Sequence, residues 1–466
     1  MGYVYINFCV WKTPPVTAKI TLKMHYRPKK FWMPHWPVPR GNREINLGLE
    51  RMNFLLDKLG NPHEDLPPVV HVAGTNGKGS TLAYLQAIFE SAGYSVHKYI
   101  SPHLRNFNER ITLNGSFIST EMVTQLAEEC RLVSEEFDIP ITFFEGITAI
   151  AFLAFSRISA DVLLLEVGMG GRLDATNVIE NPIASIITSI SLDHMEFLGN
   201  SLSQIAFEKA GILKKNGLAI FSWEPSEVMD VLIKQSEVVE SKKYACGYDW
   251  TFNKNDDDSF IITVEDKVIQ LPKPSLVGIH QYINASTAAV TALKLMEQFP
   301  KIKLENITTG ISTASWPGRM EKIKQGVLAK LLPDNFELWL DGAHNEAGAQ
   351  MLVASLQLMK PKAVIYVIHG RTIHRDMKIF LKHFVDVVEL ISCIEIMGEP
   401  DSEDPHRIKG ACDELGILAI VSDSIKDAVQ DIVRYHQCNY NENIRGRIVI
   451  CGSLFLAGDV MLANKM

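Results

Sequence analysis

Apolar runs and amphipathic runs alternate along most of this 466-residue chain. Short continuous apolar runs are typical of buried strands in a parallel sheet, whereas longer runs with an apolar face are typical of helices that cover such a sheet. The clearest apolar runs lie at residues 67–72, 94–100, 162–167 and 184–190. The alternation predicts an α/β fold in which a mostly parallel sheet is covered by helices.

A glycine-rich segment, Gly74-Thr75-Asn76-Gly77-Lys78-Gly79-Ser80, lies between the first apolar run and the amphipathic run after it. Glycines let backbone N–H groups face a phosphate, a helix N-terminus adds positive potential, and a lysine reaches the outer phosphates. The spacing is not that of the standard P-loop, because only two residues separate Gly74 from Gly77 and Gly79 follows Lys78. A glycine-rich turn with a solvated lysine is the alternative, but the position between strand and helix favours a phosphate-binding loop.

Strand–helix alternation is interrupted once and then starts again. Short alternating runs between about residues 240 and 275 predict a small antiparallel insertion. After Trp316-Pro317-Gly318-Arg319, which we expect to be an interdomain joint, the alternation resumes as a second and smaller α/β domain. We therefore predict a P-loop ATPase-like domain at residues 41–317 and a Rossmann-like domain at residues 318–466.

Composition narrows the class of protein. The net charge is −8, 47% of residues are hydrophobic and 21% are charged, which is typical of a globular protein and argues against general nucleic-acid binding. No apolar stretch has membrane-spanning length, and the seven cysteines are scattered without a metal-type cluster. We expect a cytoplasmic protein with reduced thiols and no nucleic-acid or membrane partner.

The first forty residues differ from the rest, since they contain seven Lys or Arg residues and no Asp or Glu. A targeting segment is one interpretation, but there is no apolar core followed by a small-residue cleavage site. We expect residues 1–40 to be a basic, disordered extension, for which a start codon placed too early is one explanation.

Polar residues follow the apolar runs, at the strand ends where an α/β sheet builds its site. Ser101 follows the second run, Glu166 lies near the end of the third, and His194 comes after the fourth. Ser80, Ser101 and Glu166 are candidate Mg²⁺ ligands, and His194 could bind a second metal ion. A helix-capping Glu166 and a surface His194 are the structural alternatives. Lys209, in a predicted helix, has no special role on sequence chemistry alone.

A second polar cluster, Asp341-Gly342-Ala343-His344-Asn345, ends a predicted strand of the second domain. Asp341 could bind a nucleotide hydroxyl and His344 a charged group, although a tight turn with Asn345 as helix N-cap explains the segment nearly as well. Arg319 at the joint could reach a phosphate held by the first domain, or it could form a surface salt bridge.

Eight motifs together identify a family, although each alone is modest evidence. They occur in this order: Gly74-Thr75-Asn76-Gly77-Lys78-Gly79-Ser80, Ser101-Pro102-His103, Phe107-Asn108-Glu109-Arg110-Ile111, Glu166-Val167-Gly168-Met169-Gly170-Gly171-Arg172-Leu173-Asp174-Ala175-Thr176-Asn177, Asp193-His194, Glu208-Lys209-Ala210-Gly211-Ile212, Pro317-Gly318-Arg319 and Asp341-Gly342-Ala343-His344-Asn345. Over about residues 45–466 the chain resembles the folylpolyglutamate synthase/dihydrofolate synthase family, a branch of the Mur ligase superfamily.

The resemblance implies an ATP-dependent amide ligase. ATP phosphorylates a substrate carboxylate to give an acyl phosphate, which the amine of L-glutamate then attacks. A carboxylate is a poor electrophile, so one of its oxygens must become a leaving group, while Mg²⁺ and Lys78 offset charge during phosphoryl transfer. The implied acid substrates are 7,8-dihydropteroate and tetrahydrofolate.

The resemblance also implies roles for individual residues. Ser101 and Glu166 hold one Mg²⁺, while Glu166, His194 and a carbamylated Lys209 hold or surround a second, because carbamylation would turn the lysine into an anionic oxygen ligand. His344 lies near the incoming glutamate. The implied catalytic residues are Lys78, Glu166, His194, Lys209 and His344. The implied nucleotide contacts are Gly74, Thr75, Asn76, Gly77, Lys78, Gly79, Ser80, Asn284, Arg319 and Asp341.

The branch of the family is indicated by residues 46–51 and 142–145, which resemble the bifunctional bacterial enzymes. Phe143 and Phe144 could pack on a pterin ring, although ordinary core aromatics are an equal alternative. A folylpolyglutamate synthase with a single activity and a nucleotide-dependent switch without ligase activity remain alternatives. A cell-wall peptide ligase of the same superfamily is a further alternative, but Gly79 argues against it, because those ligases resemble Gly-Lys-Thr at this position. We expect a monomer.

Overall fold

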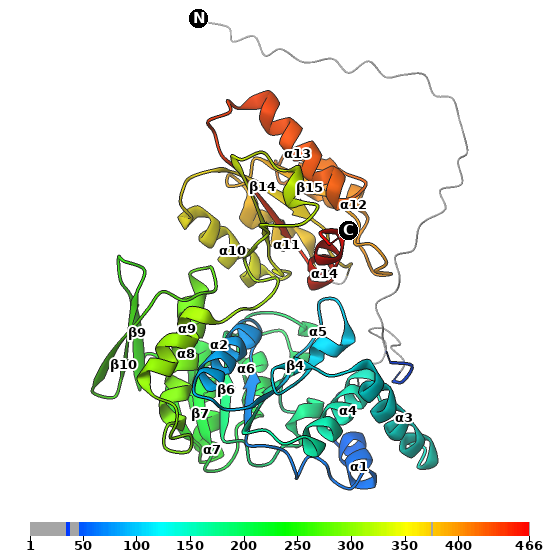
Figure 1. Cartoon of the computed structure of the whole chain (residues 1–466), viewed down its shortest axis with the longest axis vertical. Coiled ribbons are helices and arrows are strands. Elements are labelled where there is room, and N and C mark those ends of the chain that lie inside the picture. Colours follow the sequence, from blue (N-terminus) through cyan, green and yellow to red (C-terminus); the bar gives the residue numbers. More distant parts are fainter. Residues whose placement is uncertain (1–33, 38–45, 374–375, 466) are drawn as a thin grey trace, which may run out of the picture.

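The structure is a computed structural model, and it describes residues 34–37, 46–373 and 376–465. Two α/β units lie one above the other, the lower in blue to green and the upper in yellow to red (Figure 1). This confirms the expected fold class, a large mostly parallel sheet followed by a smaller α/β unit. Segment 316–319, the expected joint, lies between the last helix of the lower unit and the first strand of the upper one.

The lower unit is built on an eight-stranded sheet with the order β4-β3-β2-β5-β1-β6-β7-β8. Its strands are β1 (Val69–Ala73), β2 (Val96–Tyr99), β3 (Ile111–Leu113), β4 (Ser116–Phe117), β5 (Val162–Glu166), β6 (Ala184–Ile187), β7 (Leu218–Phe221) and β8 (Lys242–Ala245). Its helices are α1 (Glu50–Lys58), α2 (Lys78–Ser91), α3 (Thr120–Glu136), α4 (Phe143–Arg157), α5 (Met195–Leu198), α6 (Leu202–Ala210), α7 (Ser226–Val238), α8 (His280–Leu295) and α9 (Leu304–Thr313).

Helices cover both faces of this sheet, which explains why its strands are apolar throughout. Side chains alternate along a strand, so Leu164 of β5 joins the core beneath α2, α8 and α9, while Leu163 and Leu165 join the core beneath α3 and α4. Strand β5 is buried at all five positions. Continuous apolar runs were therefore a reliable sign of these central strands.

Strand β1 lies between β5 and β6 and runs parallel to both. Val72 is level with Glu166 of β5, and Ala73 is level with Ile187 of β6. The carboxyl ends of the three strands therefore meet at one edge of the sheet. This confirms the expectation that Glu166 and the segment carrying His194 flank the phosphate-loop strand.

The edge beyond β6 was not predicted from the sequence. The structure adds β7, α7 and β8 before the insertion begins, and all three belong to the main body. Strand β8 has the sequence Lys-Lys-Tyr-Ala and is only half buried, because it is the edge of the sheet. An edge strand lacks the continuous apolar run that marks a central strand. The antiparallel insertion exists, but it begins at Trp250 instead of about residue 240, because β8 belongs to the main sheet; it consists of β9 (Trp250–Lys254), β10 (Phe260–Val264) and β11 (Lys267–Leu271).

The upper unit contains a six-stranded sheet with the order β12-β13-β17-β14-β15-β16. Its strands are β12 (Glu321–Lys322), β13 (Phe336–Leu340), β14 (Val364–His369), β15 (Leu390–Cys393), β16 (Ala419–Val421) and β17 (Gly446–Cys451). Its helices are α10 (Glu346–Leu358), α11 (Met377–Leu381), α12 (Pro405–Glu414), α13 (Ile425–Asn439) and α14 (Leu454–Ala463). Residues 382–384, directly after α11, form a short 3₁₀ turn.

Most of the basic extension lies outside the described residues, so its expected disorder stays a prediction. Residues 34–37 are described, and they pack against the body instead of leaving it. His35 Nε2 lies 3.1 Å from Glu128 Oε2, and a Cβ on Gly146 of α4 would lie 2.7 Å from Pro37. Among the described residues, no helix is long and apolar enough to cross a membrane.

Candidate active site

The phosphate loop needs glycine at two positions for steric reasons. Gly77, the N-cap of α2, has a φ of 90°, a conformation that side-chain-bearing residues rarely adopt, and a Cβ there would lie 2.5 Å from Asn284 Oδ1. At Gly74 a Cβ would lie 1.9 Å from Thr188 Oγ1. The glycines thus let the loop pass close to β6 and α8, and Asn284 lies against the loop as the nucleotide-contact prediction requires.

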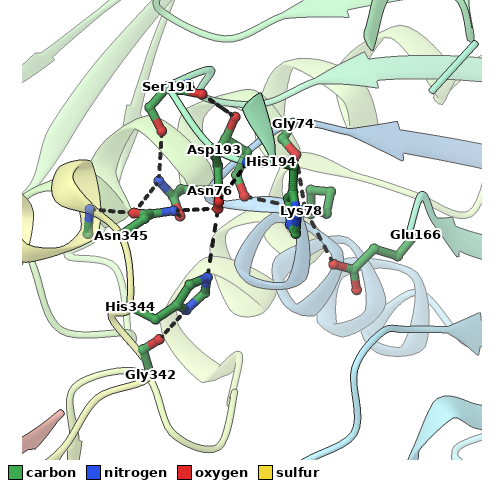
Figure 2. Close-up of polar contacts among 12 residues, drawn as sticks. Gly74, Asn76, Lys78, Glu166, Ser191, Asp193, His194, Gly342, His344 and Asn345 are labelled. Carbon is green, nitrogen blue, oxygen red and sulfur yellow. Dashed lines mark hydrogen bonds and ion pairs between the residues drawn. The ribbon is translucent and has the colours of Figure 1, made fainter. Parts of the chain in front are cut away.

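Lys78 opens α2 and folds back over the loop (Figure 2). Its Nζ donates hydrogen bonds to the carbonyl oxygens of Gly74 at 2.9 Å and Thr75 at 3.3 Å, and lies 3.9 Å from Glu166 Oε1. These contacts hold the ammonium at the carboxyl end of β1. A phosphate cradled by the loop would therefore meet a cation already in position.

Glu166 is 6% exposed at the end of β5, and burial raises its pKa while Lys78 opposes this shift. The backbone N–H of Ser101 donates to its Oε2 at 3.4 Å. The structure thus brings the two predicted Mg²⁺ ligands together beside the loop. Across the described residues, no three His, Cys, Asp or Glu side chains gather as a metal cluster.

The residues present fit Mg²⁺ bound together with a nucleotide. Such sites use one or two carboxylates and complete the coordination with phosphate oxygens and waters. Glu166 supplies one buried carboxylate and Ser101 one hydroxyl, both at the rim of the cleft. A cation at this position would also favour the ionised form of Glu166, which burial alone disfavours.

Lys209 is the unusual lysine of the site. It lies in the last turn of α6, is 4% exposed, and contributes to the same cleft as Lys78. Burial, followed by repulsion from Lys78, lowers the pKa of Lys209 to about 7. Near neutral pH much of this amine is uncharged, and only an uncharged amine reacts with CO₂. His194, by contrast, is an exposed residue with a φ of 51° on the segment after β6.

A cleft of about 280 Å³ lies between the two units and gathers most of the predicted site. Its lining includes Gly74, Thr75, Asn76, Gly77, Lys78, Gly79, Ser80, Ser101, Glu166, His194, Lys209, Arg319 and His344. Four predicted residues lie outside this lining, namely Phe143, Phe144, Asn284 and Asp341. The residues of the upper unit therefore face the phosphate loop across the cleft.

Asp341 and His344 are held mainly by the turn that carries them. Asp341 accepts the N–H of Met320 and the N–H of Ala343, both at 2.8 Å, one with each carboxylate oxygen. His344 Nδ1 donates to Gly342 O at 2.8 Å, and its Nε2 lies 4.0 Å from Asp193 Oδ2 (Figure 2). Asp341 therefore shapes the turn, while His344 reaches across to the lower unit.

Phe143 and Phe144 begin α4 close to the strand-end loops. The ring of Phe144 covers Gly168, where a Cβ would lie 2.3 Å from its Cζ, and its centroid is 6.2 Å from that of Tyr99. Phe143 lies under the guanidinium of Arg110, which is 5.9 Å from its ring centroid. Both rings are half buried and pack against the hydrophobic core, and Phe144 adjoins the cleft through Gly168, which lines it.

Both units of the chain match families of known proteins. Residues 72–292 match the Mur ligase middle domain, and residues 325–463 match the dihydrofolate synthetase C-terminal domain. The chain is 32% identical to the dihydrofolate synthase/folylpolyglutamate synthase of Bacillus subtilis, covering 89% of this chain and 94% of that protein. It is 33% identical to a probable dihydrofolate synthetase of Schizosaccharomyces pombe, covering 91% and 99%.

The chain belongs to the dihydrofolate synthase/folylpolyglutamate synthase family. Solved structures of the family share its fold. Escherichia coli FolC in complex with DHPP and ADP superposes with a TM-score of 0.77 at 28% identity, covering 91% of this chain and 94% of that one. A Yersinia pestis enzyme complexed with AMPPNP and Mn ion gives 0.76 at 28% identity, covering 91% and 94%. The expectations of a ligase, a nucleotide and a divalent metal ion agree with these relatives.

Arg110 carries a family motif, but we gave it no role from the sequence. It is 7% exposed, and its Nε donates to His103 Nδ1 at 2.8 Å. Burial lowers the pKa of Arg110, and within the described part of the chain no carboxylate forms an ion pair with it. A buried cation without an acidic partner is costly, so an anionic ligand is a reasonable partner. The sequence did not signal this role, because Arg110 ends the polar run Arg-Asn-Phe-Asn-Glu-Arg, and only the fold shows that it is buried.

Proposed function

We propose that this chain is an ATP-dependent amide ligase that joins L-glutamate to 7,8-dihydropteroate and to tetrahydrofolate through an acyl phosphate. The observation that carries the proposal is the cleft in which Lys78 and Glu166 of one unit face His344 of the other. One wall has the groups that phosphoryl transfer needs, and the opposite wall can deliver a second reactant. We expect the enzyme to act as a monomer in the cytoplasm.

The lower unit would bind ATP and activate the acid. The phosphate loop offers backbone N–H groups to the β- and γ-phosphates, and Lys78 offsets the negative charge that the transferred phosphoryl group carries. Glu166 and Ser101 would hold Mg²⁺, which when bound neutralises phosphate charge. We propose that Lys209 is carbamylated and, with His194, supports a second metal ion, because its lowered pKa leaves an amine able to take up CO₂.

The acid substrate would lie beside α4. Phe143 and Phe144 offer flat apolar surface for a pterin ring, and Arg110 next to them offers a cation for the carboxylate. Burial lowers the pKa of Arg110, while Tyr99 and then Glu166 oppose this shift, so Glu166 acts on Arg110 electrostatically without forming an ion pair with it. A carboxylate held by Arg110 would therefore be close to the phosphate end of ATP.

The upper unit would bring the amine to the acyl phosphate. His344 is fixed by its bond to Gly342 O and lies opposite Asp193 of the lower unit. We propose that this ring contacts the incoming glutamate. Arg319, at the joint and also in the cleft lining, would contact a nucleotide phosphate when the units are together.

Relatives with one activity provide the main alternative. The curated relatives include a folylpolyglutamate synthase of Lacticaseibacillus casei at 30% identity and a dihydrofolate synthetase of Saccharomyces cerevisiae at 31% identity. The relative from Bacillus subtilis carries both names. Substrate choice must therefore be measured, and it does not affect the proposed chemistry.

The test is phosphate release by the purified protein with Mg-ATP and L-glutamate, using dihydropteroate in one reaction and tetrahydrofolate in another. We expect release in both reactions, and none when the acid or the glutamate is left out. Release with a single acid would reduce the proposal to one activity. Release of phosphate without either acid or glutamate would instead indicate a nucleotide-dependent switch.

A further inference from the structure

Asn345 links the two units of the molecule. It is the N-cap of α10, where its Oδ1 accepts the N–H of Gly348 at 2.9 Å. The same side chain reaches the phosphate loop of the lower unit and forms a reciprocal amide pair with Asn76 (Figure 2). Asn345 is 5% exposed, so this contact is shielded from water.

The hydrogen-bonding capacity of Asn345 is fully used. Its Nδ2 donates to Asn76 Oδ1 at 3.2 Å and to Asp193 Oδ2 at 3.1 Å, and its Oδ1 also accepts from Asn76 Nδ2 at 3.3 Å. A primary amide has two N–H donors and an oxygen with two lone pairs, and each of them has a partner here. Partly buried amides that satisfy every group hold one orientation strongly.

Asn76 is in turn fixed to the strand-end segment that follows β6. Its backbone N–H donates to Ser189 O at 3.1 Å, and its Nδ2 donates to Ser191 Oγ at 3.3 Å. A continuous chain of hydrogen bonds therefore runs from that segment through the phosphate loop to the first turn of α10. Because His344 directly precedes Asn345, this chain of hydrogen bonds also fixes the position of His344.

We infer that Asn345 is a positioning residue that holds the upper unit against the phosphate loop and so aligns His344 with the phosphate end of ATP. The inference deepens the proposed function and rests on it for the identity of the amine. Helix capping alone does not explain the residue, because a cap needs only an acceptor and serine or aspartate serve equally well. The two N–H bonds to the lower unit are what asparagine adds.

The variant Asn345→Asp separates the two roles. Its carboxylate still caps α10, but it presents an oxygen to Asn76 Oδ1 and a negative charge to Asp193 where the wild type donates N–H groups. We expect kcat/KM for glutamate to fall at least about tenfold, the loss typical of a broken contact between buried polar partners. The melting temperature should stay close to the wild type, because the new side chain still caps α10.

A matched control is Asp404→Asn, which makes the reverse exchange at the N-cap of α12, where Asp404 accepts the N–H of His406 at 2.9 Å. It should change none of these quantities. A second variant, Asn345→Ser, keeps a cap without adding charge and should also raise the KM for glutamate. If both variants keep the wild-type melting temperature and the wild-type glutamate kinetics, Asn345 is only a helix cap and the inference is wrong.

Small-angle X-ray scattering gives a readout that does not depend on the reaction. Asn345→Asp should have a larger radius of gyration than the wild type and Asp404→Asn, because repulsion from Asp193 separates the units. An unchanged radius together with wild-type glutamate kinetics would overturn the inference. A different pair of results would contradict the proposed function and leave the positioning contact standing. In that case the wild type would release no glutamate-dependent phosphate, but Asn345→Asp would still have the larger radius of gyration.

Discussion

Two strand-end turns face each other across the cleft, and they use polar residues in opposite ways. After β1, residues 74–80 form a glycine-rich loop and hold the ammonium of Lys78 beside the carboxylate of Glu166, which ends the neighbouring strand β5. After β13, residues 341–345 use their polar side chains to bond their own backbone, as Asp341 does with both carboxylate oxygens. The comparison indicates that the lower unit carries the charged groups for phosphoryl transfer, whereas the upper unit uses its polar side chains to hold residues in place.

We expect the largest loss of activity from a substitution in the lower unit, at Lys78. Lys78→Met should lower the rate of phosphate release by about 1000-fold, because it removes the cation that offsets phosphoryl charge in a site that water does not screen. The fold should persist, since the methionine side chain can occupy the same space. Lys215→Met provides a control, because Lys215 pairs with Glu240 at the surface. A control that loses as much activity would show that the effect is not local.

The next effect concerns Lys209. Lys209→Ala should lower turnover by about 100-fold or more while the protein stays folded, because the site loses a proposed metal-supporting anion. Since the pKa of Lys209 is lowered to about 7, the reactive amine increases as pH rises through 7. With ¹³C-labelled bicarbonate, an NMR carbamate signal should therefore grow over this pH range in the wild type and be absent in the variant. A folded variant with near-full activity would remove this lysine from the mechanism.

Substitution of Arg110 should weaken the binding of the acid substrate and leave the binding of ATP unchanged. Arg110→Met should raise the KM for dihydropteroate by about 10- to 100-fold, the cost of losing a charge-assisted hydrogen bond, and should leave the KM for ATP unchanged. An analogue with a primary amide in place of the carboxylate sharpens the test. Wild type should bind dihydropteroate more tightly than this analogue, whereas Arg110→Met should not distinguish them. Equal discrimination by both proteins would place the carboxylate elsewhere.

The smallest effect on catalysis should come from the upper turn. Asp341→Asn places an amide N–H against the backbone N–H of Met320 or Ala343, so one buried donor loses its partner. We expect a loss of about 1 to 3 kcal/mol in the free energy of unfolding of the upper unit, measured in urea. If kcat falls as far as it does in Lys78→Met while stability is unchanged, Asp341 acts on the substrates and the comparison between the turns fails.

Local patterns explain what the sequence could predict. The phosphate loop and Glu166 were recognisable because glycine spacing and apolar runs are local properties, and parallel strands bring their carboxyl ends together. Strand β8 was missed because it is a half-exposed edge. The Asn76–Asn345 pair joins residues 269 positions apart, and nothing local in the sequence specifies such a contact. Family resemblance brought the motifs of the two units into one site, but it did not show how Asn345 or Arg110 act.

The most direct test of the account follows oxygen from the acid into phosphate. The acid substrate is labelled with ¹⁸O in its carboxylate and incubated with enzyme, Mg-ATP and L-glutamate. If an acyl phosphate forms and glutamate displaces phosphate from it, the released phosphate carries an ¹⁸O atom from the acid, and mass spectrometry detects it. Phosphate without label, released together with the amide product, would show that ATP does not activate the carboxylate and would contradict the central claim.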